Sequence, residues 1–134
     1  MTGITISRAL TLSAVFLAGT TAVTATPAQA AEVKITSLGS HAGEFCRQDR
    51  ALIFEDPDGT RLLYDPGRTV AGGNDPRLGK IDAVLVSHMH GDHAGDRHLP
   101  APGAGTCAKP DVSAKATPHT NAANIAIATG AKIV

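Results

Sequence analysis

The sequence has 134 residues, with 12 lysines and arginines against 12 aspartates and glutamates, so its formal net charge is zero. This length allows one small domain and excludes a multidomain protein. The even charge balance argues against a nucleic-acid-binding protein, because such proteins need a surplus of basic side chains to contact phosphates. Hydrophobic residues make up 43% and aromatic residues only 3%. The core therefore has to be built mainly from aliphatic side chains and alanine.

Residues 1–30 have the pattern of a cleaved secretory signal. Arg8 is the only charged residue in this segment, and the apolar run 9–18 follows it. Small residues then lead to Ala-Gln-Ala at 28–30, which is typical of a cleavage site. The alternative is an uncleaved membrane anchor, but a spanning helix needs roughly 20 apolar residues. We therefore expect no stable membrane anchor, and a mature domain over residues 31–134 in the periplasm or outside the cell.

Cys46 and Cys107 are the only cysteines of the chain. Export to an oxidising compartment favours a disulfide between them. Closing the long loop between these positions would stabilise the fold by roughly 4 kcal/mol. Two free buried thiols, or one thiol near a metal ion, remain as alternatives, since the sequence does not show whether the two side chains meet.

The first half of the predicted domain consists of strands and turns. Residues 33–38 alternate apolar and polar side chains, which predicts a half-buried strand. Residues 51–55 and 61–65 flank Asp-Pro-Asp-Gly at 56–59, and this turn sequence predicts a β-hairpin. Residues 66–80 contain several glycines and no periodicity, so we expect a loop there.

The second half combines a buried strand with a helix. Residues 81–87 are almost continuously apolar, which predicts a strand buried on both faces. Residues 100–118 are rich in proline and predict a long loop. Thr120 can cap a helix over 121–129 that a glycine ends, and residues 131–134 then begin another strand. This order of elements predicts an α/β or α+β layer protein.

Four candidate metal ligands follow the predicted buried strand directly. They are His88, His90, Asp92 and His93, and imidazole and carboxylate are ligands that zinc, manganese and iron accept. His88 and His90 are two positions apart, so in extended backbone their side chains leave the chain on the same side. Gly91 lets the chain turn, so that Asp92 and His93 can point to a second position. The alternative is a set of surface loop histidines with no ligand role.

This ligand pattern predicts metal-dependent hydrolysis. Two ions about 3.5–4 Å apart can hold a hydroxide between them and polarise a substrate oxygen. We expect zinc, in two sites, with manganese or iron as alternatives, and a small-molecule substrate. The hydroxide would attack an ester, a lactone, an amide or a phosphoester.

Three segments of the chain resemble one known family. Residues 87–96, Ser-His-Met-His-Gly-Asp-His-Ala-Gly-Asp, contain the H-x-H-x-D-H signature of the metallo-β-lactamase superfamily. Residues 62–67, Leu-Leu-Tyr-Asp-Pro-Gly, look like the Asp motif that ends an earlier strand in that superfamily. Residues 35–39, Ile-Thr-Ser-Leu-Gly, look like its first strand, especially in the subgroup of ascorbate-phosphate lactonase-like hydrolases.

The resemblance implies a fold and a role for each residue. The fold would be an αββα sandwich with the metal site at the edge between its two sheets. His88 and His90 would belong to the first metal site, and Asp92 and His93 to the second. Asp65 would orient the ligand loop from behind the ligands, so that Asp92 and Asp65 are the catalytic carboxylates.

The resemblance covers only the first of the two similar halves of that fold. The second half normally adds a histidine, a bridging aspartate and a final histidine, and no residues after His93 supply these in order. We expect His98 on a short helix after the motif and His119 in the proline-rich loop. His41 precedes the motif, and we expect it to be an exposed loop residue, with a place at the pocket wall as the alternative. The alternative functions are an inactive or weakly metal-binding fragment and a redox protein that uses iron. The oligomeric state stays open.

Overall fold

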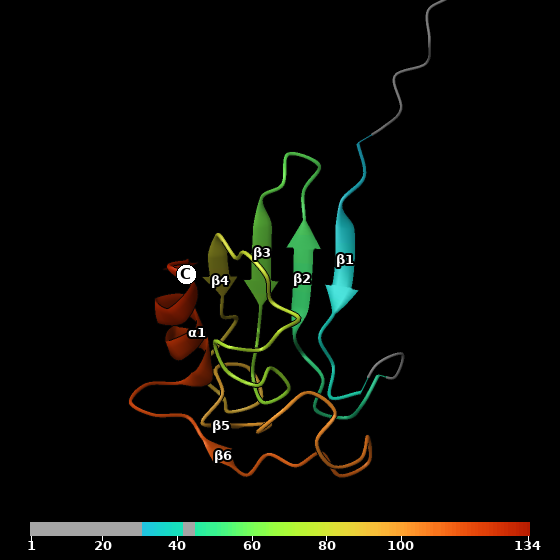
Figure 1. The fold of residues 1–134 in the computed structure, drawn as a ribbon, viewed down its shortest axis with the longest axis vertical. Helices are drawn as coiled ribbons and strands as arrows, with labels where there is room; N and C mark the ends of the chain where they lie inside the picture. Colours follow the sequence, from blue (N-terminus) through green and yellow to red (C-terminus); the bar gives the residue numbers. More distant parts are fainter. Residues whose placement is uncertain (1–30, 42–44) are drawn as a thin grey trace, which may run out of the picture.

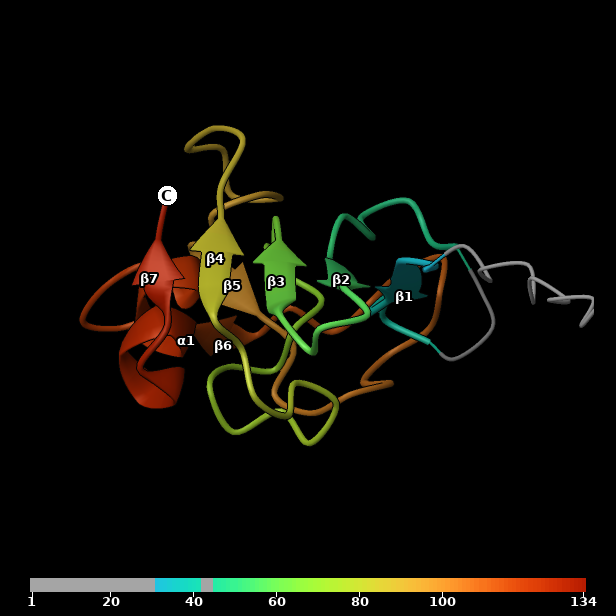
Figure 2. The ribbon, with the colours of Figure 1, turned by 90° about the horizontal axis from the view of Figure 1, so that it is seen from above.

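A computed structural model describes residues 31–41 and 45–134, so the predicted signal at 1–30 lies outside the described residues. The described chain forms a mixed five-stranded sheet in the order β1-β2-β3-β4-β7, a two-stranded ribbon of β5 and β6, and the helix α1 (Figure 1; β7 is labelled in Figure 2). The elements are β1 (Lys34–Ser37), β2 (Leu52–Glu55), β3 (Arg61–Tyr64), β4 (Ala83–Leu85), β5 (Arg97–His98), β6 (Ala114–Lys115), α1 (Asn121–Thr129) and β7 (Lys132–Ile133).

The predicted hairpin is confirmed as β2 and β3. The two strands pair antiparallel, with Leu52 opposite Tyr64 and Glu55 opposite Arg61. The turn closes where the Asp56 amide donates to the Thr60 carbonyl at 2.9 Å. These local contacts agree with the Asp-Pro-Asp-Gly turn sequence.

The first strand is confirmed, but its predicted half-burial is wrong. β1 pairs antiparallel with β2 and forms one edge of the sheet. All of its residues are exposed, including Ile35 at 59%, and Val33 just before it is 53% exposed. An edge strand has a neighbour on one side only, and no described element covers its apolar side chains.

The predicted strand over 81–87 is shorter and is buried on one face, not on both. β4 pairs parallel with β3 and with β7. Val84 is fully buried, whereas Ala83 and Leu85 beside it are only partly buried. Helix α1 covers one side of the sheet beside β4 and β7 (Figure 2), so the two alternating sets of side chains differ in burial.

The core lies on this covered face. Ile53, Leu63 and Val84 are adjacent across three neighbouring strands and are at most 1% exposed. The residues of the cluster are Leu38, Ala51, Ile53, Leu63, Val70, Leu78, Ile81, Val84, Ala122, Ile125 and Ala126. It is an aliphatic core, as the low aromatic content predicts.

The predicted helix is confirmed at both ends. Thr120 is the N-cap and its side chain accepts a hydrogen bond from the Ala123 amide. Gly130 ends the helix with a φ of 71°, a left-handed conformation that glycine adopts without strain. The chain then returns as β7, parallel to β4, so the predicted last strand is also confirmed.

His98 lies in a strand, so its predicted place on a short helix is wrong. β5 pairs antiparallel with β6, with His98 opposite Ala114. Gly95 has a φ of 80° and Pro100 follows His98 closely, and both residues interrupt helical backbone. The proline-rich segment loops back and supplies β6.

The disulfide between Cys46 and Cys107 is confirmed, with the two Cα atoms 5.1 Å apart. It joins the loop before β2 to the proline-rich loop. None of the helices in the described part of the chain is long and apolar enough to cross a membrane. The mixed sheet with a helix on one face confirms the predicted α/β class.

Candidate metal centre

The candidate site lies where β3 and β4 end. Because the two strands are parallel, their carboxyl ends meet at the same edge of the sheet, the end where β5 and β6 lie in Figure 1. Asp65 follows β3 directly, and its amide donates to the Leu85 carbonyl at the end of β4 at 2.9 Å. Ser87 and the histidine motif then continue from β4 at the same edge.

Asp65 is the buried carboxylate of this edge, with 1% exposure. It accepts hydrogen bonds from the Ser87 amide at 2.8 Å, the Ser87 hydroxyl at 2.8 Å and Nδ1 of His93 at 2.7 Å. Burial acts to raise the pKa of Asp65, but these hydrogen bonds outweigh burial and hold the pKa below its ordinary value. The residue is therefore an anion that holds Ser87 and His93 in place by hydrogen bonds.

Three imidazoles gather beside this carboxylate. Nε2 of His88 is 3.0 Å from Nδ1 of His90, and the rings of His88 and His93 have their centroids 3.9 Å apart. The Ser87 hydroxyl is 3.1 Å from Nδ1 of both His88 and His93. One hydroxyl and one carboxylate thus hold two of the three rings.

Asp92 completes the motif from the opposite side of His93. Its Oδ2 is 3.5 Å from Nε2 of His93. Because Nδ1 of His93 donates a hydrogen bond to Asp65, the Nε2 atom that faces Asp92 is left as an acceptor. This donor set, a carboxylate facing an imidazole nitrogen, is suited to zinc.

The structure brings the four predicted ligands together: His88 contacts both His90 and His93, and Asp92 lies beside His93. Over residues 31–41 and 45–134, no three His, Cys, Asp or Glu side chains already surround a common point as in a formed metal site. The remaining histidines lie apart from the motif. His41 contacts the Gly105 carbonyl, and the His98 ring contacts the Leu99 carbonyl, while His119 is exposed before α1.

Backbone contacts that the sequence did not indicate hold the motif loop in place. The Gly67 amide donates to the His93 carbonyl at 2.8 Å. Gly67 has a φ of 47°, and a Cβ there would collide with the Asp92 carbonyl. Asn121, fully buried at the start of α1, donates through Nδ2 to the Gly67 carbonyl at 3.0 Å and the Val70 carbonyl at 2.8 Å. An asparagine at the start of a helix is too common a feature to have revealed this role.

Two arginines border the motif loop, and no sequence pattern pointed to either of them. Arg50 places Nε 3.6 Å from Oδ2 of Asp92. Arg68 donates through Nε and Nη2 to Oδ1 of Asp96 at 3.1 and 2.8 Å. The Arg68 guanidinium holds the pKa of Asp96 below its ordinary value. Both arginines come from loops, so their contacts depend on the tertiary path of the chain.

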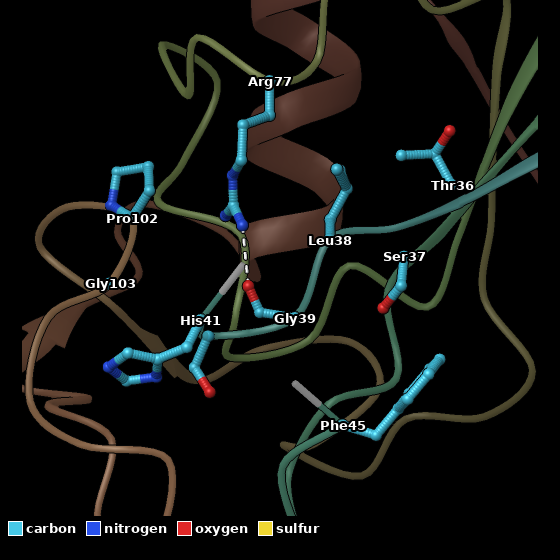
Figure 3. A pocket seen from close by; sticks show the side chains of 10 residues that line it. Thr36, Ser37, Leu38, Gly39, His41, Phe45, Arg77, Pro102 and Gly103 are labelled. Carbon is cyan, nitrogen blue, oxygen red and sulfur yellow. Dashed lines mark hydrogen bonds between the residues drawn. The ribbon is translucent and has the colours of Figure 1, made fainter. Parts of the chain in front are cut away.

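A separate pocket of about 440 Å³ lies beyond the end of β1 (Figure 3). Its walls include Leu38, His41, Phe45 and Pro102, and Arg77 donates to the Gly39 carbonyl across one wall at 2.7 Å. This places His41 at a pocket wall. The histidine motif does not line this pocket. His41 and Arg77 are the residues of its lining that carry titratable side chains, whereas the motif brings several histidines and carboxylates into contact with one another.

Residues 48–132 match the family model described as "Beta-lactamase superfamily domain". The match covers more than half of the chain and includes both the Asp65 turn and the histidine motif, so the protein belongs to this superfamily. The predicted membership of the metallo-β-lactamase superfamily is confirmed, and it indicates a hydrolase-type function. The proposed lactonase-like subgroup depends on residues 35–39, which lie outside the match, and stays a prediction. Comparison with curated proteins and with solved structures found no match.

Proposed function

We propose that this protein is an exported, metal-dependent hydrolase that cleaves an ester, a lactone, an amide or a phosphoester of a small molecule. The observation that carries the proposal is the hydrogen-bonded group at the ends of β3 and β4, in which Asp65 and Ser87 hold His88 and His93. His88, His90, Asp92 and His93 would hold zinc, in two sites, with manganese or iron as alternatives.

The residues fit a zinc ion through their donor chemistry. Asp65 occupies Nδ1 of His93, which fixes the ring and its tautomer and leaves Nε2 for a metal. When bound, zinc would act as a Lewis acid, which lowers the pKa of bound water to about 7 and polarises the oxygen of the scissile group. His88 and His90 are exposed, so a small substrate can reach this face of the loop.

The test is the zinc content of the dialysed 134-residue chain, compared between the parent, His88→Ala and Asp92→Ala. We expect the parent to retain zinc weakly, since each predicted site has two protein ligands and catalytic zinc normally has three. Both variants should lose zinc, together with turnover of 4-nitrophenyl acetate or bis(4-nitrophenyl) phosphate. His119→Ala is the matched control, because His119 is exposed and lies outside the motif, and it should retain both.

Unchanged zinc content in both variants would remove the proposed site. Zinc retention that depends on His88 and Asp92, but without turnover of any ester, would favour a metal-binding protein over a hydrolase.

The proposal of export rests on the pattern of residues 1–30. Mass spectrometry of the secreted or periplasmic protein should find Ala31 at the N-terminus. Recovery of the intact chain from the cytosol would contradict export.

A further inference from the structure

Arg50 is held in place beside the predicted metal ligand Asp92 by its chain neighbours. The carboxylate of Asp49 accepts from the Ser40 amide at 2.9 Å, the Ser40 hydroxyl at 3.0 Å and the Cys46 amide at 2.7 Å. On the other side, the buried Ala51 accepts from the Leu38 amide at 2.9 Å. The backbone is thus anchored on both sides of Arg50, and the Cys46 disulfide ties the same loop to Cys107.

The side chain of Arg50 is exposed at the candidate site. Its side chain is 43% exposed and that of Asp92 is 35% exposed. The nearest carboxylate along the chain is that of Asp49, and it already accepts hydrogen bonds from Ser40 and the Cys46 amide. Within the described ranges, Asp92 is therefore the carboxylate that balances the charge of Arg50.

The second arginine of this region is in a different situation. Arg68 is 28% exposed and pairs through two nitrogens with Asp96, which is not a predicted ligand. The Asp96 carboxylate therefore stays paired with Arg68 whether or not a metal ion is bound. Arg50, in contrast, shares its partner with the proposed ion, and a metal held by Asp92 competes for the same carboxylate.

We propose that Arg50 binds an anionic group of the substrate, so that this hydrolase selects small substrates with a carboxylate or a phosphate next to the scissile bond. The inference rests on the proposed function, since it needs an ion at Asp92. With an ion at Asp92, two positive charges share this one carboxylate, and an anionic group of the substrate beside Arg50 would offset the remaining positive charge. The planar edge of a guanidinium matches the oxygens of a carboxylate or a phosphate.

The test compares two esters that share a leaving group and differ in charge. 4-Nitrophenyl hydrogen succinate carries a free carboxylate, and 4-nitrophenyl butyrate does not. With the zinc-loaded 134-residue chain, Arg50→Gln should raise the KM of the charged ester about tenfold, as expected for a lost charge-assisted hydrogen bond. The KM of the neutral ester should change by less than about twofold.

Arg47→Gln is the matched control. Arg47 lies on the same loop, is exposed, and forms no ion pair among the described residues. The substitution removes the same charge and should leave both KM values unchanged. An equal loss in Arg47→Gln would show a general charge effect and would overturn the role of Arg50.

A binding measurement gives a readout that does not depend on turnover. Calorimetry on the zinc-loaded proteins, with inorganic phosphate and with monomethyl succinate as probes, should show binding that Arg50→Gln weakens. The probe that is more strongly affected identifies the anionic group as phosphate or carboxylate. Equal affinities of parent and Arg50→Gln for both probes would overturn the inference.

The zinc content of each protein separates the two proposals. Zinc bound by the parent, without any effect of Arg50 on anion binding or on KM, overturns this inference and leaves the proposed function intact. A parent that retains no zinc overturns the proposed function, and the role of Arg50 with it.

Discussion

Asp65 connects backbone conformation with the chemistry of the candidate site. It is the one residue besides glycine with a positive φ among those described, at 43°, and aspartate and asparagine tolerate this region better than most residues. The turn places its carboxylate against Ser87 and His93. The orientation of the His93 imidazole therefore depends on the left-handed backbone conformation of Asp65.

We predict that Asp65→Asn lowers the zinc affinity by tenfold or more, the range expected for residues that support metal ligands. The fold should persist, because asparagine tolerates the same φ. An amide next to Nδ1 of His93 can donate a proton where the carboxylate only accepted one, which favours the wrong tautomer. Competition with a zinc chelator measures the affinity, and circular dichroism reports the fold. Asp58→Asn, in the exposed hairpin turn, is the control, and equal affinities in the two variants would contradict the role of Asp65.

Asp75 is a buried carboxylate that stabilises the fold away from the site. It pairs with Arg77 at 2.7 Å and accepts from the Ala71 and Arg77 amides. Burial acts to raise its pKa, but the hydrogen bonds from Arg77 and these amides outweigh burial and hold the pKa of Asp75 below its ordinary value. Arg77 in turn donates to the Gly39 and Thr69 carbonyls, so the pair ties the loop after β1 to the loop between β3 and β4.

The lowered pKa of Asp75 predicts how stability depends on pH. A carboxyl whose pKa falls on folding stabilises the protein above its ordinary pKa of about 3.9, and this contribution is lost as the pH falls through the lower folded value. Asp75→Asn should reduce the free energy of unfolding at pH 7 by about 3 kcal/mol, because it leaves the Arg77 charge unpaired. Urea unfolding between pH 7 and pH 3 should show a flatter acid dependence in the variant. Asp111→Asn, at an exposed position, should match the parent in both respects.

At the scale of elements, the loops after β3 and β4 are packed directly against each other. Gly67, after β3, approaches the Asp92 carbonyl so closely that no side chain fits between them. The buried Asn121 then ties the start of α1 to the same loop. The position of the motif loop therefore depends on the loop after β3 and on α1, as well as on β4.

Gly67→Ala should both destabilise the protein and weaken zinc binding. Gly59→Ala is the matched control, because Gly59 also has a positive φ, 90°, but a Cβ there meets no atom within 4 Å. Gly59→Ala should cost about 1 kcal/mol from backbone strain alone. Gly67→Ala should cost about 2 kcal/mol more, because the new methyl group displaces the Asp92 backbone. Thermal unfolding and chelator competition measure the two effects, and equal zinc affinities would show that the close approach is unimportant for the ligands.

Sequence patterns predicted the elements that depend on neighbouring residues and failed for those that depend on distant ones. The hairpin turn and the helix from Asn121 to Thr129 are confirmed, because turn and capping residues act within a few positions. The half-burial predicted for β1 and the helix predicted around His98 are wrong. Those features depend on which element covers a strand and on the pairing of β5 with β6.

At the scale of the whole molecule, one disulfide connects two long loops around the sheet. Cys46 and Cys107 are 61 positions apart, and the segment between them includes β2, β3, β4 and the candidate site. The bond restricts the unfolded chain strongly, because it closes a long loop. It also anchors the loop that carries Arg50.

We predict that Cys46→Ser combined with Cys107→Ser lowers the free energy of unfolding by about 4 kcal/mol, the entropy expected for a loop of this length. Urea unfolding measures the loss, and the parent with reductant should behave like the double variant. A much smaller loss would mean that the unfolded chain is already compact, or that the loops are held mainly by Asp49 and Arg77.

The sequence by itself determined the class of the protein, the ligand motif and the local elements. The motif from His88 to His93 spans six consecutive positions, and the one possible cysteine pair follows from composition, so neither needs a three-dimensional path. Only the tertiary structure decided that Asp65 meets His93, that Arg50 faces Asp92 and that Asn121 holds the Gly67 loop. The partners in these contacts are 28 or more positions apart in the chain. They meet because parallel pairing of β3 and β4 brings two strand ends to one edge, and because α1 and the disulfide-linked loop pack against that edge.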